Sequence, residues 1–300
     1  MFDDIHFKSG DYEARNSIIN LIKKKYSFAQ ISVLSKTVCN RDISCIQLGS
    51  NTSPVLFAGA FHGMEWLTSL ILLKFTIEVC EAIQNSSTIY DVDIKNFLSK
   101  CGLFIIPCVN PDGVEISLHG PAAAGNFKDL VYNASNGNTT RWQANAKGVD
   151  INHNFNANWS KLHELEKKHG ILTSSPTRYG GPFPNSEIET CTLVKLCCDI
   201  NFRHALAFHS QGEEIYWDFN NCQPPCSKCI ANVLADSSGY KLNQPEPLAT
   251  GGGFKDWFIS YFYKPAFTIE VGLGRNPLPI SELEPIYKKI HKMMVLAVTS

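Results

Sequence analysis

Three side chains at the ends of expected strands could bind a metal ion. His62 and Glu65 lie three residues apart in "AFHGMEW", where an apolar strand gives way to a helix, so both side chains can face one point. His209 closes a separate apolar strand in "LAFHSQGEE". Two imidazoles and one carboxylate leave an open position for water, which is the ligand set of a catalytic rather than a structural zinc. A lone His-x-x-Glu pair is often incidental, but three such strand-end residues predict one bound zinc ion.

A fourth residue, Glu270, suggests what the metal is for. It lies in "PAFTIEVG", where alternation and apolar neighbours place it at the carboxyl end of another strand. A carboxylate beside a zinc site can act as general base, because zinc lowers the pKa of water in its open position to about 7. The alternative is a glutamate paired with a cation at a strand end. We expect Glu270 to be the base of a hydrolase.

Alternating strands and helices must position these four residues. The 300 residues are 44% hydrophobic and 18% charged, enough to bury a large core. Strands that alternate with helices predict an α/β fold whose mostly parallel sheet is covered on both faces, with ligands beyond the strands' carboxyl ends. The expected elements are a helix from Tyr12, two strands within 31–49, a strand within 54–62, a helix after Glu65, a strand within 102–109, a helix from 186 capped by Ser186, a strand within 204–210, helices at 230–239 and from Lys255, a strand within 265–272 and a closing helix to Val298.

The segment from Glu115 to about Pro184 is rich in Gly, Asn and Pro, and it follows four turn-forming residues at 110–113. We expect a long loop here, interrupted only by a short charged helix at 161–168. Loops of this length inside a compact fold usually carry function or shape a cleft.

The charge balance excludes one class of partner. Lys plus Arg number 27 against 28 Asp plus Glu, which gives a net charge of −1 and no basic excess for nucleic acid. The richest apolar stretch, Trp66 to Ile83, is interrupted by polar residues and predicts a buried helix rather than a membrane span. The acidic start lacks an export signal, so we expect a cytoplasmic protein. The sequence leaves the oligomeric state open.

Eleven cysteines fit a reducing compartment better than a disulfide framework, because their number is odd and their spacing follows no framework. Cys222, Cys226 and Cys229 fall together in the turn-rich "NNCQPPCSKC". Plain loop thiols are the favoured interpretation. Most of a structural zinc site, or one disulfide, are the alternatives.

The order of several motifs resembles the zinc carboxypeptidase A/B-type metallopeptidases. These motifs are "FHGMEW", "NPDG", "GVDINHNF", "YGGPFPNSEIET", "FHS", "GGGFKDW" and "FTIEVG". The resemblance extends from about Tyr12 to the C-terminus. It implies one α/β/α catalytic domain over 1–300 without a prodomain, a central mixed sheet of about eight strands, zinc on the three ligands named above, and Glu270 as the base.

The sequence departs from the exopeptidase pattern at substrate-binding positions. Where the family's "Asn-Arg-Asn" motif clamps a terminal carboxylate, this chain has Asn152, His153 and Asn154. Histidine cannot make the two-pronged contact of arginine, although Asn152 remains available to substrate. The family arginine that supports the oxyanion follows a tryptophan, but here Gln143 takes that position, so either Gln143 or Arg141 must donate. The family's substrate-capping tyrosine is also missing.

These departures resemble the branch that cleaves γ-D-glutamyl to diamino-acid bonds in bacterial cell-wall peptides. Arg275 is then either a contact for a substrate carboxylate or a surface residue, and Arg178 is a second candidate cation. The predicted substrate is a small peptide, such as a muropeptide. The alternatives are a carboxypeptidase acting on C-terminal residues, a related amide deacylase, and an inactive binding module for cell-wall peptides. The last would require loss of a ligand or the base, and all four residues are present.

Overall fold

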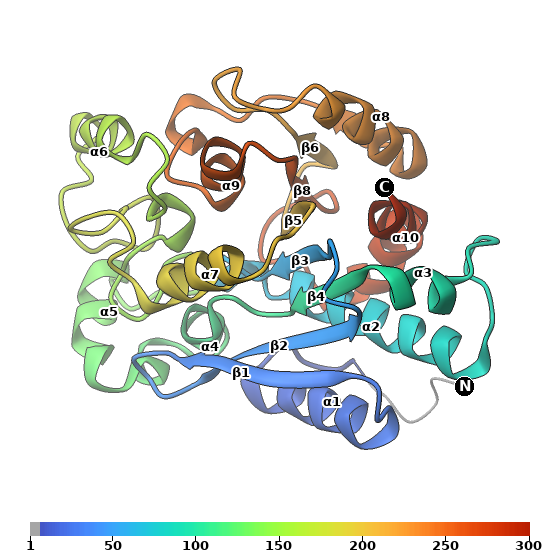
Figure 1. The fold of residues 1–300 in the computed structure, drawn as a ribbon. Coiled ribbons are helices and arrows are strands. Elements are labelled where there is room, and N and C mark those ends of the chain that lie inside the picture. Colours follow the sequence, from blue (N-terminus) through green and yellow to red (C-terminus); the bar gives the residue numbers. More distant parts are fainter. Residues whose placement is uncertain (1–6) are drawn as a thin grey trace.

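A mixed sheet of eight strands runs through the centre of the molecule, in the order β1-β2-β4-β3-β5-β8-β6-β7 (Figure 1). The computed structural model describes residues 7–300. Its strands are β1 (Gln30–Lys36), β2 (Asp42–Gly49), β3 (Val55–Gly59), β4 (Gly102–Ile106), β5 (His204–His209), β6 (Glu214–Tyr216), β7 (Lys241–Leu242) and β8 (Ala266–Glu270). The predicted α/β class and the mixed sheet of about eight strands are confirmed.

The central strands are parallel, and they carry the candidate site at one edge. β3 pairs in parallel with β4 and β5, and β5 pairs in parallel with β8, whereas β1 and β2 add an antiparallel edge. β3, β4 and β5 are buried along their whole length, as expected for strands covered on both faces. Because β3, β5 and β8 run in one direction, the chain leaves all three at the same side of the sheet.

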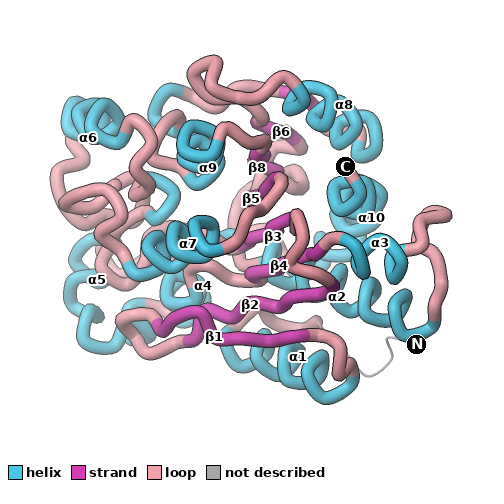
Figure 2. Tube along the Cα trace, in the orientation of Figure 1, coloured by secondary structure: helices cyan, strands magenta, loops and turns pink. Residues whose placement is uncertain are grey.

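Helices cover both faces of the sheet, and Figure 2 shows them around the central strands. In β3, Val55 and Phe57 join one hydrophobic cluster, whereas Leu56 and Ala58 join another, which is the alternation of a pleated strand. The first cluster takes side chains from α1, α2, α3, α8 and α10, and the second from α7 and α9. The helices are α1 (Tyr12–Lys25), α2 (Leu67–Asn85), α3 (Ile94–Lys100), α4 (Pro111–His119), α5 (Lys128–Ser135), α6 (Trp159–Lys168), α7 (Ile188–Asp199), α8 (Cys226–Ser238), α9 (Phe254–Phe262) and α10 (Leu283–Thr299).

The segment expected as a long loop from Glu115 also contains the end of α4 and the whole of α5, so that prediction was wrong in part. Residues 110–113 do not form a turn. Asn110 is the N-cap of α4 and accepts a hydrogen bond from Gly113 N at 2.8 Å, Pro111 occupies the first turn, and Asp112 adds a favourable charge there. Turn residues and helix-start residues are the same types, and the sequence alone did not separate them. α5 follows after a short 3-10 segment, and α6 lies where the charged helix was expected.

Two further helix starts differ from expectation. Ser186 does not cap α7, because the N-cap residue is Glu187 and the Ser186 hydroxyl donates to the Glu187 carboxylate at 2.9 Å. α8 begins at Cys226, not near residue 230, so Cys226 and Cys229 lie in its first turn rather than in a loop. All eleven cysteines are free thiols in this structure.

The expectation of a cytoplasmic protein rests on the N-terminal segment. Residues 1–6 of that segment lie outside the described residues. Within residues 7–300, none of the helices combines the length and the apolar character needed to cross a bilayer.

Candidate active site

A tight turn after β3 brings the side chains of His62 and Glu65 together. β3 ends at Gly59, and a short 3-10 turn, Gly63–Glu65, follows His62. A methyl group added at Gly63 would lie 2.1 Å from the carbonyl oxygen of Gly113 and 2.8 Å from that of Trp142, so only glycine fits. The turn therefore packs directly against α4 and against the loop that contains Trp142.

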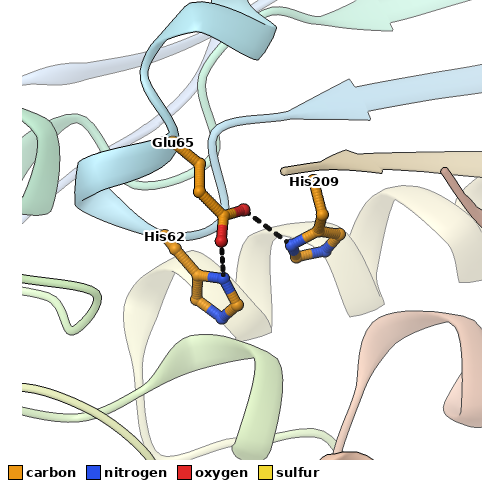
Figure 3. A group of neighbouring side chains, drawn as sticks. All are labelled: His62, Glu65 and His209. Atoms are coloured by element: carbon orange, nitrogen blue, oxygen red, sulfur yellow. Dashed lines mark hydrogen bonds and ion pairs between the residues drawn. The ribbon is translucent and has the colours of Figure 1, made fainter. Parts of the chain in front are cut away.

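The three expected ligands meet at the carboxyl ends of β3 and β5. His62 Nδ1 lies 2.9 Å from Glu65 Oε1, and His209 Nδ1 lies 3.0 Å from Glu65 Oε2 (Figure 3). The possible ligand atoms of the three residues all lie within 4.8 Å of one another. Both imidazoles thus turn the same nitrogen toward one carboxylate. This donor set fits a zinc ion that keeps an open coordination position.

The electrostatics of this group also suit a divalent cation. Burial alone would raise the pKa of Glu65, but His62 and His209 lower it to about 2, so the carboxylate is ionised. Burial lowers the pKa of His209 and favours its neutral, ligating form. Burial also opposes charge on His62, yet Glu65 and Asp150 raise its pKa well above the usual range. The negative potential that favours a proton there would favour a metal ion as well.

Asp150 supports His62 from the side opposite Glu65, and the search for functional residues in the sequence missed it. His62 Nε2 lies 3.1 Å from Asp150 Oδ1, and Asp150 is buried. Despite that burial, the charges of His62 and His153 and hydrogen bonds lower the pKa of Asp150 below its usual range. A carboxylate that holds the second nitrogen of a ligating histidine fixes its tautomer and orientation. The signal in the sequence is the motif "GVD", whose last residue is this aspartate.

Glu270 ends β8 directly beside His209. The two residues are register partners in the parallel β5–β8 ladder, so their side chains point to the same face of the sheet. Burial raises the pKa of Glu270 well above its usual range, and the nearby charge of Glu65 adds to this. A carboxyl group with a raised pKa can take and return a proton near neutral pH.

A cavity of about 680 Å³ opens over this group, within the size range of sites for small molecules. It gathers most of the residues predicted from the sequence. The lining includes His62, Glu65, Arg141, Gln143, Asn152, His153, Arg178, His209 and Glu270.

Both candidates for oxyanion support reach this cavity. Arg141 is exposed, and its Nη1 donates to the carbonyl oxygen of Asn276 at 3.3 Å. The Gln143 side chain accepts a hydrogen bond from the Thr177 hydroxyl, and its own amide N–H groups have no partner among residues 7–300. The structure brings Arg141 and Gln143 to the same cavity and does not separate their roles.

Asn152 and His153 form part of one wall. Asn152 Oδ1 accepts a hydrogen bond from Phe254 N at 3.0 Å, which fixes the start of α9. His153 is buried, and its Nδ1 lies 2.8 Å from Oε1 of the fully buried Glu166. Glu166 also contacts His163 Nδ1 at 3.1 Å. His153 thus has a buried acidic partner that does not itself line the cavity.

The two candidate arginines lie in different places. Arg178 lines the cavity, its backbone N donates to Asp150 Oδ2 at 2.9 Å, and its guanidinium pairs with Glu246. Arg275 is exposed and is not among the residues that line the cavity. The structure therefore brings Arg178, but not Arg275, together with the metal ligands.

A buried ion pair in the cavity wall was also missed. The ammonium of Lys255 pairs with Asp256 and donates to the carbonyl oxygen of Asp218 at 2.7 Å. Both side chains are buried and both line the cavity. The signal in the sequence is the adjacent Lys and Asp of the motif "GGGFKDW".

Comparison with known proteins identifies the family. The family model described as zinc carboxypeptidase matches residues 15–292. The chain belongs to the zinc carboxypeptidase family. It is a zinc metallopeptidase, as the ligand pattern and the motif order predicted.

Individual relatives agree with this assignment. The peptidase is 34% identical over 284 residues to gamma-D-glutamyl-L-diamino acid endopeptidase 1 of Lysinibacillus sphaericus, an alignment that covers 93% of this chain and 69% of the relative. In fold it is similar to carboxypeptidase A from Helicoverpa armigera, with a TM-score of 0.74 and 18% identity over 100% of this chain and 74% of that one. It is also similar to murein-tripeptide amidase from Escherichia coli O157, with a TM-score of 0.53 and 21% identity over 89% of this chain and 91% of that one.

Proposed function

We propose that the peptidase hydrolyses the amide bond between a γ-D-glutamyl residue and a diamino acid in small cell-wall peptides. The observation that carries this proposal is the similarity to an endopeptidase named for that bond, which extends over 93% of this chain. The wall of the cavity supports it. At the position where exopeptidases of the family carry a carboxylate-clamping arginine, the chain has His153. We also propose that residues 1–300 act as one catalytic unit.

In this proposal His62, Glu65 and His209 hold one zinc ion. When bound, zinc would act as a Lewis acid toward the scissile carbonyl and lower the pKa of water. Glu270 accepts the proton of the attacking water and returns it to the leaving amine. Its position beside His209 and its raised pKa support this role.

Oxyanion support then falls to Arg141 or Gln143, which both line the cavity. Gln143 has amide N–H groups without a partner in the described part of the chain, and these are suitable donors. Arg141 is a cation, and its Nη1 donates a hydrogen bond to the backbone carbonyl of Asn276 at 3.3 Å. Single substitutions of Arg141 and Gln143 can show which of them supports the oxyanion.

The substrate is a peptide that carries carboxylates. His153, Asn152 and Arg178 are the proposed contacts, because each lines the cavity and can donate a hydrogen bond. Arg275 is not among the proposed contacts, because it does not line the cavity. A small anionic peptide needs a few local donors rather than a basic surface, which agrees with the net charge of −1.

A cytoplasmic location fits the same proposal. Eleven free thiols suit a reducing compartment. Muropeptides imported for recycling would bring a cell-wall substrate to such an enzyme. Fractionation of the source cells, followed by detection of the protein with an antibody, tests this part separately.

One incubation tests the activity. The zinc-loaded protein is mixed with L-Ala-γ-D-Glu-diaminopimelate and, separately, with blocked peptides that end in ordinary L-residues, and the products are identified by mass. Release of diaminopimelate from the first substrate alone is expected. Cleavage of the second set alone would overturn the proposal in favour of a carboxypeptidase. The Glu270→Gln variant is the control for contaminating activity.

A further inference from the structure

Two buried acidic side chains at the start of α7 share one amide group. Asn145 Nδ2 lies 2.7 Å from Glu187 Oε2 and 3.3 Å from Glu189 Oε2. Asn145 and Glu189 are completely buried, and Glu187 is 2% exposed. The pair belongs to the "NSEIET" part of a motif to which the proposed chemistry gives no role. None of the three residues lines the cavity.

Asn145 uses its whole side chain to close a short loop. While its Nδ2 donates to the two acids, its Oδ1 accepts hydrogen bonds from Lys147 N at 3.0 Å and from Val149 N at 3.1 Å. Its backbone carbonyl accepts the indole N–H of Trp142 at 3.3 Å. An amide offers two donors and two acceptor sites, so this residue is fully satisfied. The shape of the loop 142–150 thus depends on Asn145.

The same loop is bonded to the turn between His62 and Glu65. Gly63 N donates to Gln143 O at 3.0 Å, and Met64 N donates to Trp142 O at 2.8 Å. At its other end the loop presents Asp150, whose Oδ1 lies 3.1 Å from His62 Nε2. The two acids are therefore linked, through Asn145 and the backbone of the loop, to the turn between His62 and Glu65 (the metal-ligand turn) and to the side chain of His62.

We propose that Glu187 and Glu189 are positioning residues that hold the loop 142–150 against the metal-ligand turn, with Asn145 as the bridge. They touch neither substrate nor metal ligand, and they act by fixing the loop that carries Gln143 and Asp150 and that begins directly after Arg141. The catalytic importance of those three rests on the proposed function. The positioning of the metal-ligand turn depends only on contacts within this chain.

The two acids have different surroundings. Burial raises the pKa of Glu189 to about 8, and the charges of Asp112 and Glu187 contribute, so Glu189 holds a proton near neutral pH. Its Oε1 has no hydrogen-bond partner within residues 7–300, which a neutral carboxyl tolerates better than an ionised one. Glu187 instead has the ammonium of Lys147 at 3.3 Å from its Oε2. The other acid whose charge acts on Glu189, Asp112, is paired with Arg41 at 2.8 Å.

Conservative and disruptive variants of Glu189 test the proposal on the zinc-loaded protein. Glu189→Gln preserves a neutral group of the same shape, whereas Glu189→Ala removes it. The readouts are hydrogen exchange of peptides covering 142–150 and the rate at which a chelator removes zinc. For Glu189→Ala we expect faster exchange in that segment and about tenfold faster zinc loss, the lower end of what outer partners of metal ligands contribute. Glu189→Gln should resemble the natural protein in both.

Glu78→Ala is the matched control. Glu78 is a partly buried acid whose Oε2 accepts the Tyr287 hydroxyl at 2.6 Å, far from the loop 142–150 in the sequence and absent from the cavity lining. Its loss should lower the midpoint of thermal unfolding without selectively loosening that loop. Equal exchange of the loop in Glu189→Ala and Glu78→Ala at matched stability would overturn the proposal. So would a Glu189→Gln variant that loses zinc as fast as Glu189→Ala.

Steady-state kinetics add a separate readout. If the loop also positions the oxyanion donor, Glu189→Ala should lower kcat by about tenfold and leave KM within about twofold, because only groups around the reacting carbonyl are displaced. Exchange and zinc loss need no substrate. A failure to cleave muropeptides would thus reject the proposed function and leave this inference intact, whereas unchanged exchange would reject the inference alone.

Discussion

The carboxylate of Asp150 lies on the far side of His62 from Glu65, with Oδ1 3.1 Å from His62 Nε2, while Glu65 Oε1 lies 2.9 Å from Nδ1. The ring is thus held at both nitrogens, and only one of the two partners belongs to the ligand set. A ligand oriented in this way loses little freedom when a metal binds.

Asp150→Asn should therefore weaken zinc binding by about 10- to 100-fold, because the amide removes the charge that orients His62 and raises its basicity. Competition with a chromogenic chelator measures the affinity. Asp150 Oδ2 also accepts Arg178 N at 2.9 Å, so thermal unfolding of the zinc-free variant serves as the control for fold. An unchanged zinc affinity would show that Asp150 is not needed to orient the ligand.

Glu270→Gln should lower kcat by about 10²- to 10⁴-fold, the usual contribution of a general base, without loss of zinc. Metal content by atomic emission and turnover of the diaminopimelate tripeptide are measured on the same sample. Glu282→Gln, at a helix start that does not line the cavity, is the matched control. Full activity in Glu270→Gln would reject the proposed base.

Arg141→Ala and Gln143→Ala separate the two candidates for oxyanion support. Removal of the true donor should cost about 10²- to 10³-fold in kcat, whereas removal of the other should change mainly KM. Since Gln143 also accepts the Thr177 hydroxyl, Thr177→Val controls for a simple displacement of that side chain. A loss below tenfold in both single variants would mean that neither residue supports the reacting carbonyl.

The sequence predicted the sheet, and it predicted that the candidate site residues would lie together, because both follow from local patterns. The continuous apolar runs of β3, β4 and β5 are typical of parallel strands buried on both faces, and parallel strands bring their ends together. His62, Glu65, His209 and Glu270 could therefore be expected to meet. Their roles as ligands and base stay predictions.

The residues that support the site were not predictable in the same way. Asp150 contacts His62 across 88 residues of chain, and Glu187 and Glu189 contact Asn145 across 42 and 44 residues. No periodicity in the sequence shows which of these side chains will meet. Arg275 illustrates the converse. It follows Glu270 by five residues, yet the chain after β8 turns it away from the cavity lining, and side-chain direction in a loop has no local signature.

His153→Ala should raise KM for carboxylate-bearing peptides by about tenfold and change kcat little, the pattern for loss of a group that binds substrate and transition state equally. His153 lines the cavity, and its Nδ1 contacts Glu166, which does not line it. His163→Ala is the matched control, because His163 contacts the same Glu166 but does not line the cavity. Equal KM changes in the two variants would reduce His153 to a structural partner of Glu166.

Glu189 should make the stability of the protein fall as the pH rises. Its pKa is raised from 4.5 to about 8 in the folded state, so between these values the folded protein keeps a proton that the unfolded chain has released. The stabilisation is complete below about pH 4.5, decreases by at most about 1.4 kcal/mol per pH unit, and is lost once the pH passes about 8. Denaturant unfolding of the natural protein and of Glu189→Gln at pH 6, 7 and 8 measures this, because the amide cannot titrate. The difference in free energy of unfolding between the two proteins should change by up to about 1.4 kcal/mol for each pH unit from pH 6 to pH 8. A constant difference would mean that Glu189 does not change its protonation in this range.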